Sequence, residues 1–359
     1  MFGTKQIQEA GDNAQQINAS QIVINNIISI DEHKIDEKIK QALQIYSIEA
    51  NNIATERMKN FADKLIPDLV KENLLESLRE PSIQFTLLDA QRSAASTERP
   101  ADYSILSELL IHRIKKGNDR NIIAGVNGAV KIVNEISDEA LSGLTVYYSL
   151  ANFIPVSPEI YDGIKILNNM FSAIIIDNPL PEGNQWLDNL DVLNAVRIPS
   201  ISSLNKFNTY YPKILSGYTE TGINKSSIEY EQALKIIQDS QLPQDILIDH
   251  QLMKNYVRLS IADLADIEYN SEFGEFNLSH EQKKAVKKIY SLYNQDKELH
   301  AKTIEAFLNL WDSFETLKQI KIWYNSIRQN ISVTSIGKAL AHANAHRLYT
   351  DLPSLESLS

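Results

Sequence analysis

A pair of histidines near the C-terminus has a spacing that could bind a metal ion. His342 and His346 are four residues apart, so both side chains would project from one side of a helix. Two imidazoles at this spacing can hold one zinc ion, but a zinc site needs a third ligand and usually a fourth. No glutamate lies between them, as it does in the metalloprotease motif. The pattern favours a solvated helix flank, with a metal-dependent hydrolase or nuclease as the alternative.

Clustered lysines could contact an anionic partner. They are Lys283, Lys284, Lys287 and Lys288. Such a run can bind nucleic acid or an anionic membrane surface, although a solvated helix face is its more common meaning. The whole chain has 46 acidic against 35 basic residues and a net charge of −11. This balance argues against nucleic-acid binding as the main activity, because neutralising phosphates requires many Lys and Arg side chains.

Other catalytic patterns are weak. The sequence contains no cysteine, which excludes thiolate zinc sites and cysteine nucleophiles. Gly125-Val126-Asn127-Gly128 lacks the Lys-Ser/Thr of a phosphate-binding loop and is better explained by close helix packing. Asp249-His250 and Ser279-His280 are sequence neighbours, which do not face one another on a helix. We therefore identify no catalytic residue, and we expect a non-enzymatic protein without a cofactor.

Composition and length indicate a globular protein of several units. The chain has 359 residues, of which 43% are hydrophobic, enough for a sizeable core. The absence of cysteine suits a reducing compartment, and we see no signal peptide, spanning helix or lipidation motif. We expect a cytoplasmic location.

The first thirty residues differ from the rest of the chain. Gln and Asn alternate with Ile and Val about a Gly-Asp-Asn turn, which predicts a β-hairpin. An isolated hairpin is marginally stable, so pairing with copies from neighbouring chains is the preferred interpretation. Docking on its own domain and a disordered tail are the alternatives. The expected assembly residues are Gln6, Ile7, Gln8, Gly11, Asp12, Asn13, Gln16, Ile17, Gln21, Ile22 and Ile24.

Helical periodicity dominates from about residue 31. A narrow apolar stripe predicts a long helix from Glu32 to Ile66 that packs as a stalk against a partner helix. Pro67 and Pro81 should bracket a further helix.

The middle of the chain should contain further capped helices. We expect Asp102 and Ser137 to act as N-caps, and a helix from about Pro158 to Ile174 that leads into an apolar patch over Ala173 to Ile176. Residues 200–227 have little periodicity, which predicts either a mobile insertion whose Tyr210, Tyr211 and Tyr218 form a partner surface or a packed irregular loop.

The C-terminal region reads as a series of helices. Residues 226–240 and 245–261 should be helical, and Ser279 with Gln282 has the pattern of a capping box. Apolar residues keep helical spacing through 304–327, where aromatic side chains should belong to a core or an interface.

These elements predict a mainly α protein, an elongated multi-helix body with an N-terminal β-assembly segment. The expected units are a hairpin over 1–30, a stalk over 31–80, a helical subdomain over 81–199 and a C-terminal helical subdomain over 200–359.

Several short motifs resemble bacterial abortive-infection alpha-type proteins. They are Arg79-Glu80-Pro81, then Asp102-Tyr103 with Leu106, Leu109 and Leu110, then Ala129 to Leu144 with Ile136-Ser137-Asp138-Glu139-Ala140, and the late Val333-Thr334-Ser335-Ile336-Gly337-Lys338-Ala339-Leu340. The opening segment is similar to the amyloid-like or oligomerising tags of bacterial defence proteins, although its glycine and asparagine spacing departs from the Ile-Gln-x-Gly-x-x-Asn core. The resemblance implies a cytoplasmic, helical phage-defence protein and carries over no catalytic residues.

The function that we expect is therefore a self-assembling component of anti-phage defence. Its partners would be copies of itself and a phage-derived or co-encoded protein. Membrane disruption through the apolar 160–176 region is a further alternative.

Overall fold

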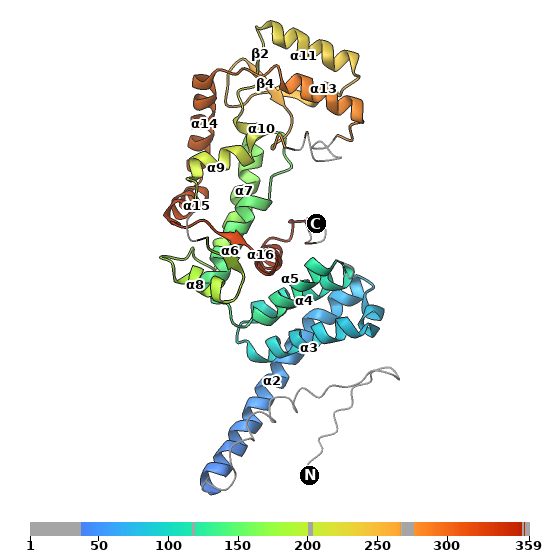
Figure 1. The fold of residues 1–359 in the computed structure, drawn as a ribbon, viewed down its shortest axis with the longest axis vertical. Coiled ribbons are helices and arrows are strands. Elements are labelled where there is room, and N and C mark those ends of the chain that lie inside the picture. Colours follow the sequence, from blue (N-terminus) through green and yellow to red (C-terminus); the bar gives the residue numbers. More distant parts are fainter. Residues whose placement is uncertain are drawn as a thin grey trace.

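The computed structural model describes residues 37–116, 119–199, 204–265, 267, 276–353 and 355. This part of the chain is mainly helical, with 14 α-helices and five short strands. The molecule is elongated: helix α2 projects from one end, and a small sheet lies at the other (Figure 1). The hairpin expected over 1–30 lies outside the described residues.

Helix α2 (Glu37–Lys71) is a single element of 35 residues. The expected break before Pro67 is wrong, because the helix continues to Lys71 and is followed by the 3-10 helix η2 (Leu75–Arg79). Leu65 and Leu69, on either side of the proline, are 5% and 1% exposed. Their burial against the body outweighs the hydrogen bond that proline cannot donate.

The C-terminal half of α2 packs against the helices α3 and α4. The first helices of the body are α3 (Pro81–Ser96), α4 (Pro100–Lys115) and α5 (Arg120–Ile132). The prediction that Asp102 caps α4 is wrong, because Arg99 occupies the N-cap position and Asp102 lies in the first turn. Pro100 explains the difference, since its fixed φ and missing N–H suit the first helical position.

The larger hydrophobic core continues into the centre of the molecule. Its helices are α6 (Asp138–Asn152), α7 (Ile160–Ile175), α8 (Gln185–Val192) and α16 (Ser335–Leu348), and α16 packs on α4, α5 and α6. The cap at Ser137 is confirmed, since its hydroxyl accepts the N–H of Ala140 at 3.1 Å. A two-residue antiparallel ladder joins β1 (Val196–Arg197) to β5 (Ser332–Val333) just before α16.

The segment after residue 203 is ordered core rather than a mobile insertion. It forms α9 (Phe207–Ile214) and α10 (Ser216–Thr219). Tyr211 and Tyr218 are both 0% exposed, so they cannot form the expected partner surface. Aromatic packing is the physical reason: the ring of Tyr211 lies 4.7 Å from that of Trp311 and 4.8 Å from that of Phe207.

A second, smaller core surrounds a three-stranded antiparallel sheet in the order β2-β4-β3. Its elements are β2 (Ile223–Asn224), α11 (Ile228–Asp239), η3 (Gln244–Ile246), β3 (Leu247–Asp249), β4 (Tyr256–Leu259) and α13 (His280–Tyr290). The helix expected over 245–261 is wrong, because β3 and β4 form a hairpin there whose turn includes Asn255 at φ +67°. The capping box of Ser279 and Gln282 is confirmed.

The periodic run over 304–327 is two helices, α14 (Lys297–Asp312) and α15 (Glu315–Ser326). Both bury the apolar residues expected of them, including Trp311 and Trp323. Core residues from both sides of position 200 belong to the larger cluster. The proposed division at residue 200 stays a prediction.

Candidate functional site

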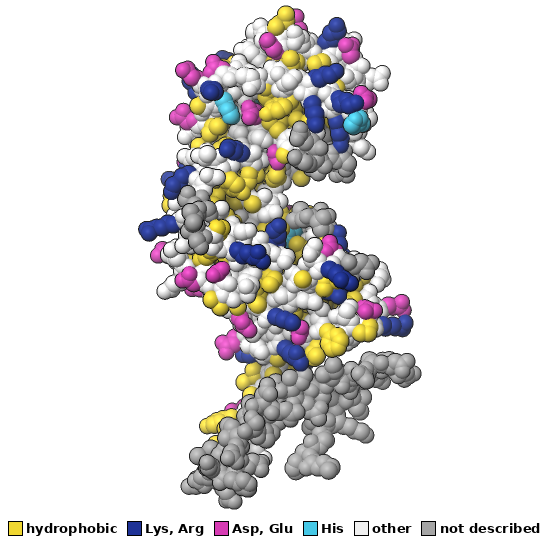
Figure 2. Space-filling view, in the orientation of Figure 1, with side chains coloured by type: hydrophobic (Ala, Val, Ile, Leu, Met, Phe, Trp, Pro, Cys, Tyr) yellow, Lys and Arg dark blue, Asp and Glu magenta, His cyan; other side chains and the backbone are white. Residues whose placement is uncertain are grey.

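The N-terminal half of α2 carries exposed apolar side chains. Leu43, Tyr46 and Ile53 are 39%, 64% and 50% exposed, and Ile45 and Ile48 are 55% and 60% exposed. Figure 1 shows this half of the helix extending beyond the helices of the body. Hydrophobic side chains are also visible on the surface of this projecting part in Figure 2. A group of exposed apolar residues on one projecting element is typical of an interaction surface.

Three of these residues share one line along the helix. Leu43, Tyr46, Ala50 and Ile53 follow one another at intervals of three, four and three residues, the alternation that gives coiled coils their repeat of 3.5 residues when it continues. We call these four residues the stalk seam. An overlapping side of α2 contacts the body further along the helix, where Phe61, Leu65 and Leu69 are buried, whereas the stalk seam lies on the part that extends beyond the body. The stalk seam is therefore available to another helix.

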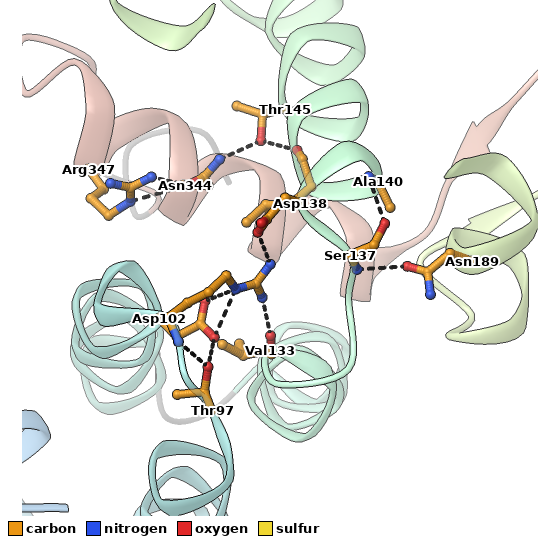
Figure 3. A network of polar contacts seen from close by, with 12 residues as sticks. Thr97, Asp102, Val133, Ser137, Asp138, Ala140, Thr145, Asn189, Asn344 and Arg347 are labelled. Atoms are coloured by element: carbon orange, nitrogen blue, oxygen red, sulfur yellow. Dashed lines mark hydrogen bonds and ion pairs between the residues drawn. The ribbon is translucent and has the colours of Figure 1, made fainter. Parts of the chain in front are cut away.

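A partly buried polar network connects α4, α5 and α6 (Figure 3). Arg99 contacts Asp102 at 3.1 Å and Asp138 at 2.7 Å, and it donates to the carbonyl of Val133 at 2.6 Å. Thr97 donates to Asp102 at 2.5 Å. Burial raises the pKa of Asp102, and the hydrogen bond from Thr97 and the charge of Arg99 oppose that rise. One arginine thus ties together the beginnings of α4 and α6 and the end of α5.

A second group of polar contacts joins α16 to α6. Asn344 donates to the hydroxyl of Thr145 at 2.9 Å, and Arg347 donates to the side-chain oxygen of Asn344 at 2.9 Å (Figure 3). These groups satisfy one another, as buried polar groups must. We assign both groups of contacts a structural role, because their side chains join α4, α5, α6 and α16.

The structure places His342 inside the protein. It is 0% exposed, and its Nε2 lies 2.9 Å from the carbonyl oxygen of Pro353. Burial lowers its pKa to about 4. The expected solvated flank is therefore wrong at this position. His342 is buried because its neighbours on α16 are small. Ala341, Ala343 and Ala345 are all 0% exposed, and their short side chains let neighbouring helices approach α16 from several sides.

His346 points to a different partner. Its Nδ1 lies 3.4 Å from the carboxylate of Glu108 on α4. Although burial opposes the effect, His346 lowers the pKa of Glu108. Within the described part of the chain, no group of three or more His, Cys, Asp or Glu side chains is placed to hold a metal ion. The two histidines are thus engaged separately.

The remaining candidates for chemistry also have structural partners. His250 is buried, and its Nε2 lies 2.9 Å from the carbonyl oxygen of Glu220, while Asp249 pairs with Lys225 at 2.5 Å. Ser279 accepts the backbone N–H of Gln282. Neither sequence pair forms a hydrolytic arrangement.

The two glycines of α5 serve packing, as the sequence predicts. A Cβ atom at Gly125 would lie 2.9 Å from Ser335, and one at Gly128 would lie 2.6 Å from Ile336. Their absence of side chains lets α5 and α16 approach closely.

The clustered lysines lie on α13, at the far end of the molecule from the stalk (Figure 1). Figure 2 shows several Lys or Arg side chains near one another in this region. Lys284 pairs with Glu281 at 2.9 Å, and Lys287 and Lys288 are exposed. An anionic partner for this face stays a prediction.

Sequence reasoning missed one fully buried cation. Arg258 on β4 is 0% exposed and donates to the carbonyls of Gly217, Leu259 and Ile261 at 3.3, 2.8 and 3.1 Å, and to that of Pro158. Its guanidinium also lies 5.2 Å from the ring centroid of Tyr218. The one signal in the sequence for the burial of Arg258 is that it lies between the apolar residues Val257 and Leu259.

The apolar region 160–176 is largely occupied by the protein itself. Helix α7 buries Ile160, Ile164, Leu167, Met170, Phe171 and Ile174 in the larger core. Among the described residues, no helix combines the length and the hydropathy needed to cross a bilayer.

Comparison with known proteins gives a match to one family model. No curated protein and no solved structure matches the chain. A family model with the description ":-like" matches residues 28–356, most of the chain, and the protein belongs to that family.

Proposed function

We propose that this protein is a self-assembling component of bacterial anti-phage defence. Copies would associate through the N-terminal segment 1–30 and the stalk seam, and the helical body would contact a phage-derived or co-encoded protein. The observation that carries the assembly step is the stalk seam, whose Leu43, Tyr46 and Ile53 are 39%, 64% and 50% exposed. The sequence resemblance to abortive-infection proteins supports the defence role.

A second copy of the chain is the partner that best fits the stalk seam. Its 3.5-residue spacing matches the geometry in which two similar helices interlock side chains. Helices of about 12–15 residues are marginal in water without tertiary contacts, so the projecting half of α2 would gain stability from such a partner.

The test replaces the seam with charges. We expect the triple variant Leu43→Glu, Tyr46→Glu, Ile53→Glu to reduce the particle mass measured by light scattering after size-exclusion chromatography, and deletion of residues 1–30 to reduce it as well. The matched control is Phe85→Glu, Val192→Glu, Ile322→Glu, whose wild-type side chains are 70%, 79% and 60% exposed on other helices. An unchanged mass in both the seam variant and the deletion would contradict assembly through this end.

The defence role has its own measurement. Cells that express the wild-type protein should yield fewer phage plaques than cells with an empty vector. The seam variant should lose that protection, whereas the control triple should retain it. Equal plaque counts with and without the wild-type protein, across a panel of phages, would contradict a defence function while leaving the assembly result intact.

A further inference from the structure

A small cavity lies where α6, α9 and α15 meet. Its volume is about 190 Å³, and its lining consists of Tyr147, Leu204, Asn205, Tyr210, Tyr324 and Asn330. Pockets for drug-sized ligands have about 300–1,000 Å³, so this one has room for a single ring system. Among the residues that the structure describes, the lining includes aromatic rings and carboxamides but no charged side chain.

The three tyrosine rings of the cavity share one orientation. Tyr324 is within 9° of parallel to Tyr147 and within 7° of parallel to Tyr210, at centroid distances of 6.2 and 5.8 Å. Phe207 meets Tyr324 edge-on at 5.7 Å and holds it in place. The rings come from three different helices that share the larger core. They are therefore oriented before any ligand binds.

The cavity offers polar groups to a ligand, and one of them, the carboxamide of Asn205, belongs to an exposed residue. Tyr147 donates to the carbonyl oxygen of Ile331 at 3.2 Å. Among the described residues, we find no hydrogen-bond partner for the hydroxyls of Tyr210 and Tyr324. The carboxamides of Asn205 and Asn330, which also line the cavity, likewise have none among the described residues.

The tyrosines are donors at neutral pH. Burial raises the pKa of Tyr147 to about 12, and burial also raises the pKa values of Tyr210 and Tyr324. The hydroxyls therefore stay protonated. Each carboxamide adds donors and an acceptor held in one plane.

We propose that this cavity binds a nucleobase, free or as its nucleoside. Nucleobases are flat, fit beside aromatic rings, and present adjacent donors and acceptors that asparagine side chains match. The described lining residues include no Lys or Arg, which argues for the uncharged base or nucleoside over the phosphate of a nucleotide. The site is separate from the stalk seam, and the inference does not depend on the proposed assembly.

Calorimetric titration of the full-length protein tests the proposal. The probes are adenine, guanine, cytosine, uracil and their nucleosides, with glucose and galactose for comparison. We expect saturable binding of at least one base or nucleoside with one site per chain, and no binding of the sugars. Failure of every base and nucleoside to bind the wild-type protein at millimolar concentration, or binding of the sugars instead, would overturn the assignment.

Two substitutions locate the binding. Tyr324→Phe keeps the ring and removes the hydroxyl, and Asn330→Ala removes a carboxamide from a half-buried loop position. Each should weaken Kd about tenfold, the effect of losing one hydrogen bond of about 1.4 kcal/mol. Tyr161→Phe is the matched control, because Tyr161 is 51% exposed outside the cavity. Binding that is unchanged in both cavity variants would show that the ligand lies elsewhere.

Discussion

His342 shows how burial changes the meaning of a residue. In a sequence, a histidine one turn from another suggests a metal ligand or a solvated helix face. In the structure, its ring lies 6.1 Å from that of Tyr148 and 5.4 Å from that of Phe153, centroid to centroid. Its Nδ1 is buried and has no hydrogen-bond partner within the described part of the chain. A neutral imidazole is the form that this environment accepts, because a charged ring would lose its hydration without gaining a full set of partners.

A pH dependence of stability follows from this burial. The pKa of His342 falls from 6.5 to about 4 on folding, so the unfolded chain binds the proton more readily than the folded one. Stability is therefore full above pH 6.5 and declines as the pH falls toward 4. We expect this residue to account for about 2 kcal/mol of lost stability between pH 7 and pH 4.5.

Urea unfolding at several pH values measures this effect. In His342→Gln the loss of stability between pH 7 and pH 4.5 should be smaller than in the wild-type protein. The exposed His280, replaced in the same way, should leave the pH profile unchanged. The same pH profile in the wild-type protein and His342→Gln would show that His342 does not carry the dependence.

At the level of elements, α16 depends on close contacts made through small residues. Gly337 lies in its first turn, where a Cβ atom would be 2.1 Å from the carbonyl oxygen of Ala195. That same oxygen accepts the N–H of Thr334, the N-cap of α16, at 3.0 Å. The glycine thus lets the ladder of β1 and β5 lead directly into α16.

We expect Gly337→Ala to destabilise the protein by about 1–3 kcal/mol, because the added methyl group meets backbone that cannot move freely. Helix propensity alone predicts the opposite sign, a gain of about 1 kcal/mol. The free energy of unfolding, measured in urea for the wild-type protein and Gly337→Ala, shows whether the substitution destabilises or stabilises the protein. Ser335→Ala, at an exposed position in the same turn, is the control and should change stability little.

Local signals in the sequence identified many elements correctly. The cap at Ser137 and the capping box at Ser279 depend on side chains within three residues, which the sequence displays directly. The exceptions depended on distant packing. Pro67 was expected to end α2, and the residues of β3 and β4 were expected to be helical, because neither the burial of Leu69 nor the pairing of two short strands is visible in a local pattern.

Of the two candidate binding sites, the sequence predicts the stalk seam in part and the cavity not at all. The exposed apolar stripe of the stalk follows from its narrow periodicity. The cavity could not have been predicted, because Tyr147, Tyr210 and Tyr324 come from three helices that only the tertiary fold brings together. No spacing in the chain relates these residues.

At the level of the whole molecule, Arg258 connects two separate cores. It lies on β4, the central strand of the smaller core, and donates to Pro158 just before α7 and to Gly217 in α10. Both α7 and α10 supply side chains to the larger core. Its acceptors are backbone carbonyls, which remain in place whatever side chain replaces it.

Arg258→Met should therefore uncouple the cores. The substitution leaves at least three buried carbonyl acceptors without their donor, at about 1–3 kcal/mol for each unsatisfied group. We expect the calorimetric unfolding transition to separate into two, with the smaller core melting first. The exposed Arg328, replaced by Met, is the control and should leave the transition single. A single transition at the wild-type temperature in Arg258→Met would contradict this role.

The length of α2 has a mechanical consequence. At 35 residues the helix is about 52 Å long, and its base is held firmly by the body while its far half projects. It therefore acts as a lever: because the projecting half is about 26 Å long, a tilt of about 10° would displace its far end by about 5 Å. Conversely, joining the far ends of two such helices would fix the distance and the relative direction of two bodies, so a small change in how Phe61, Leu65 and Leu69 pack in one copy would change the spacing between copies.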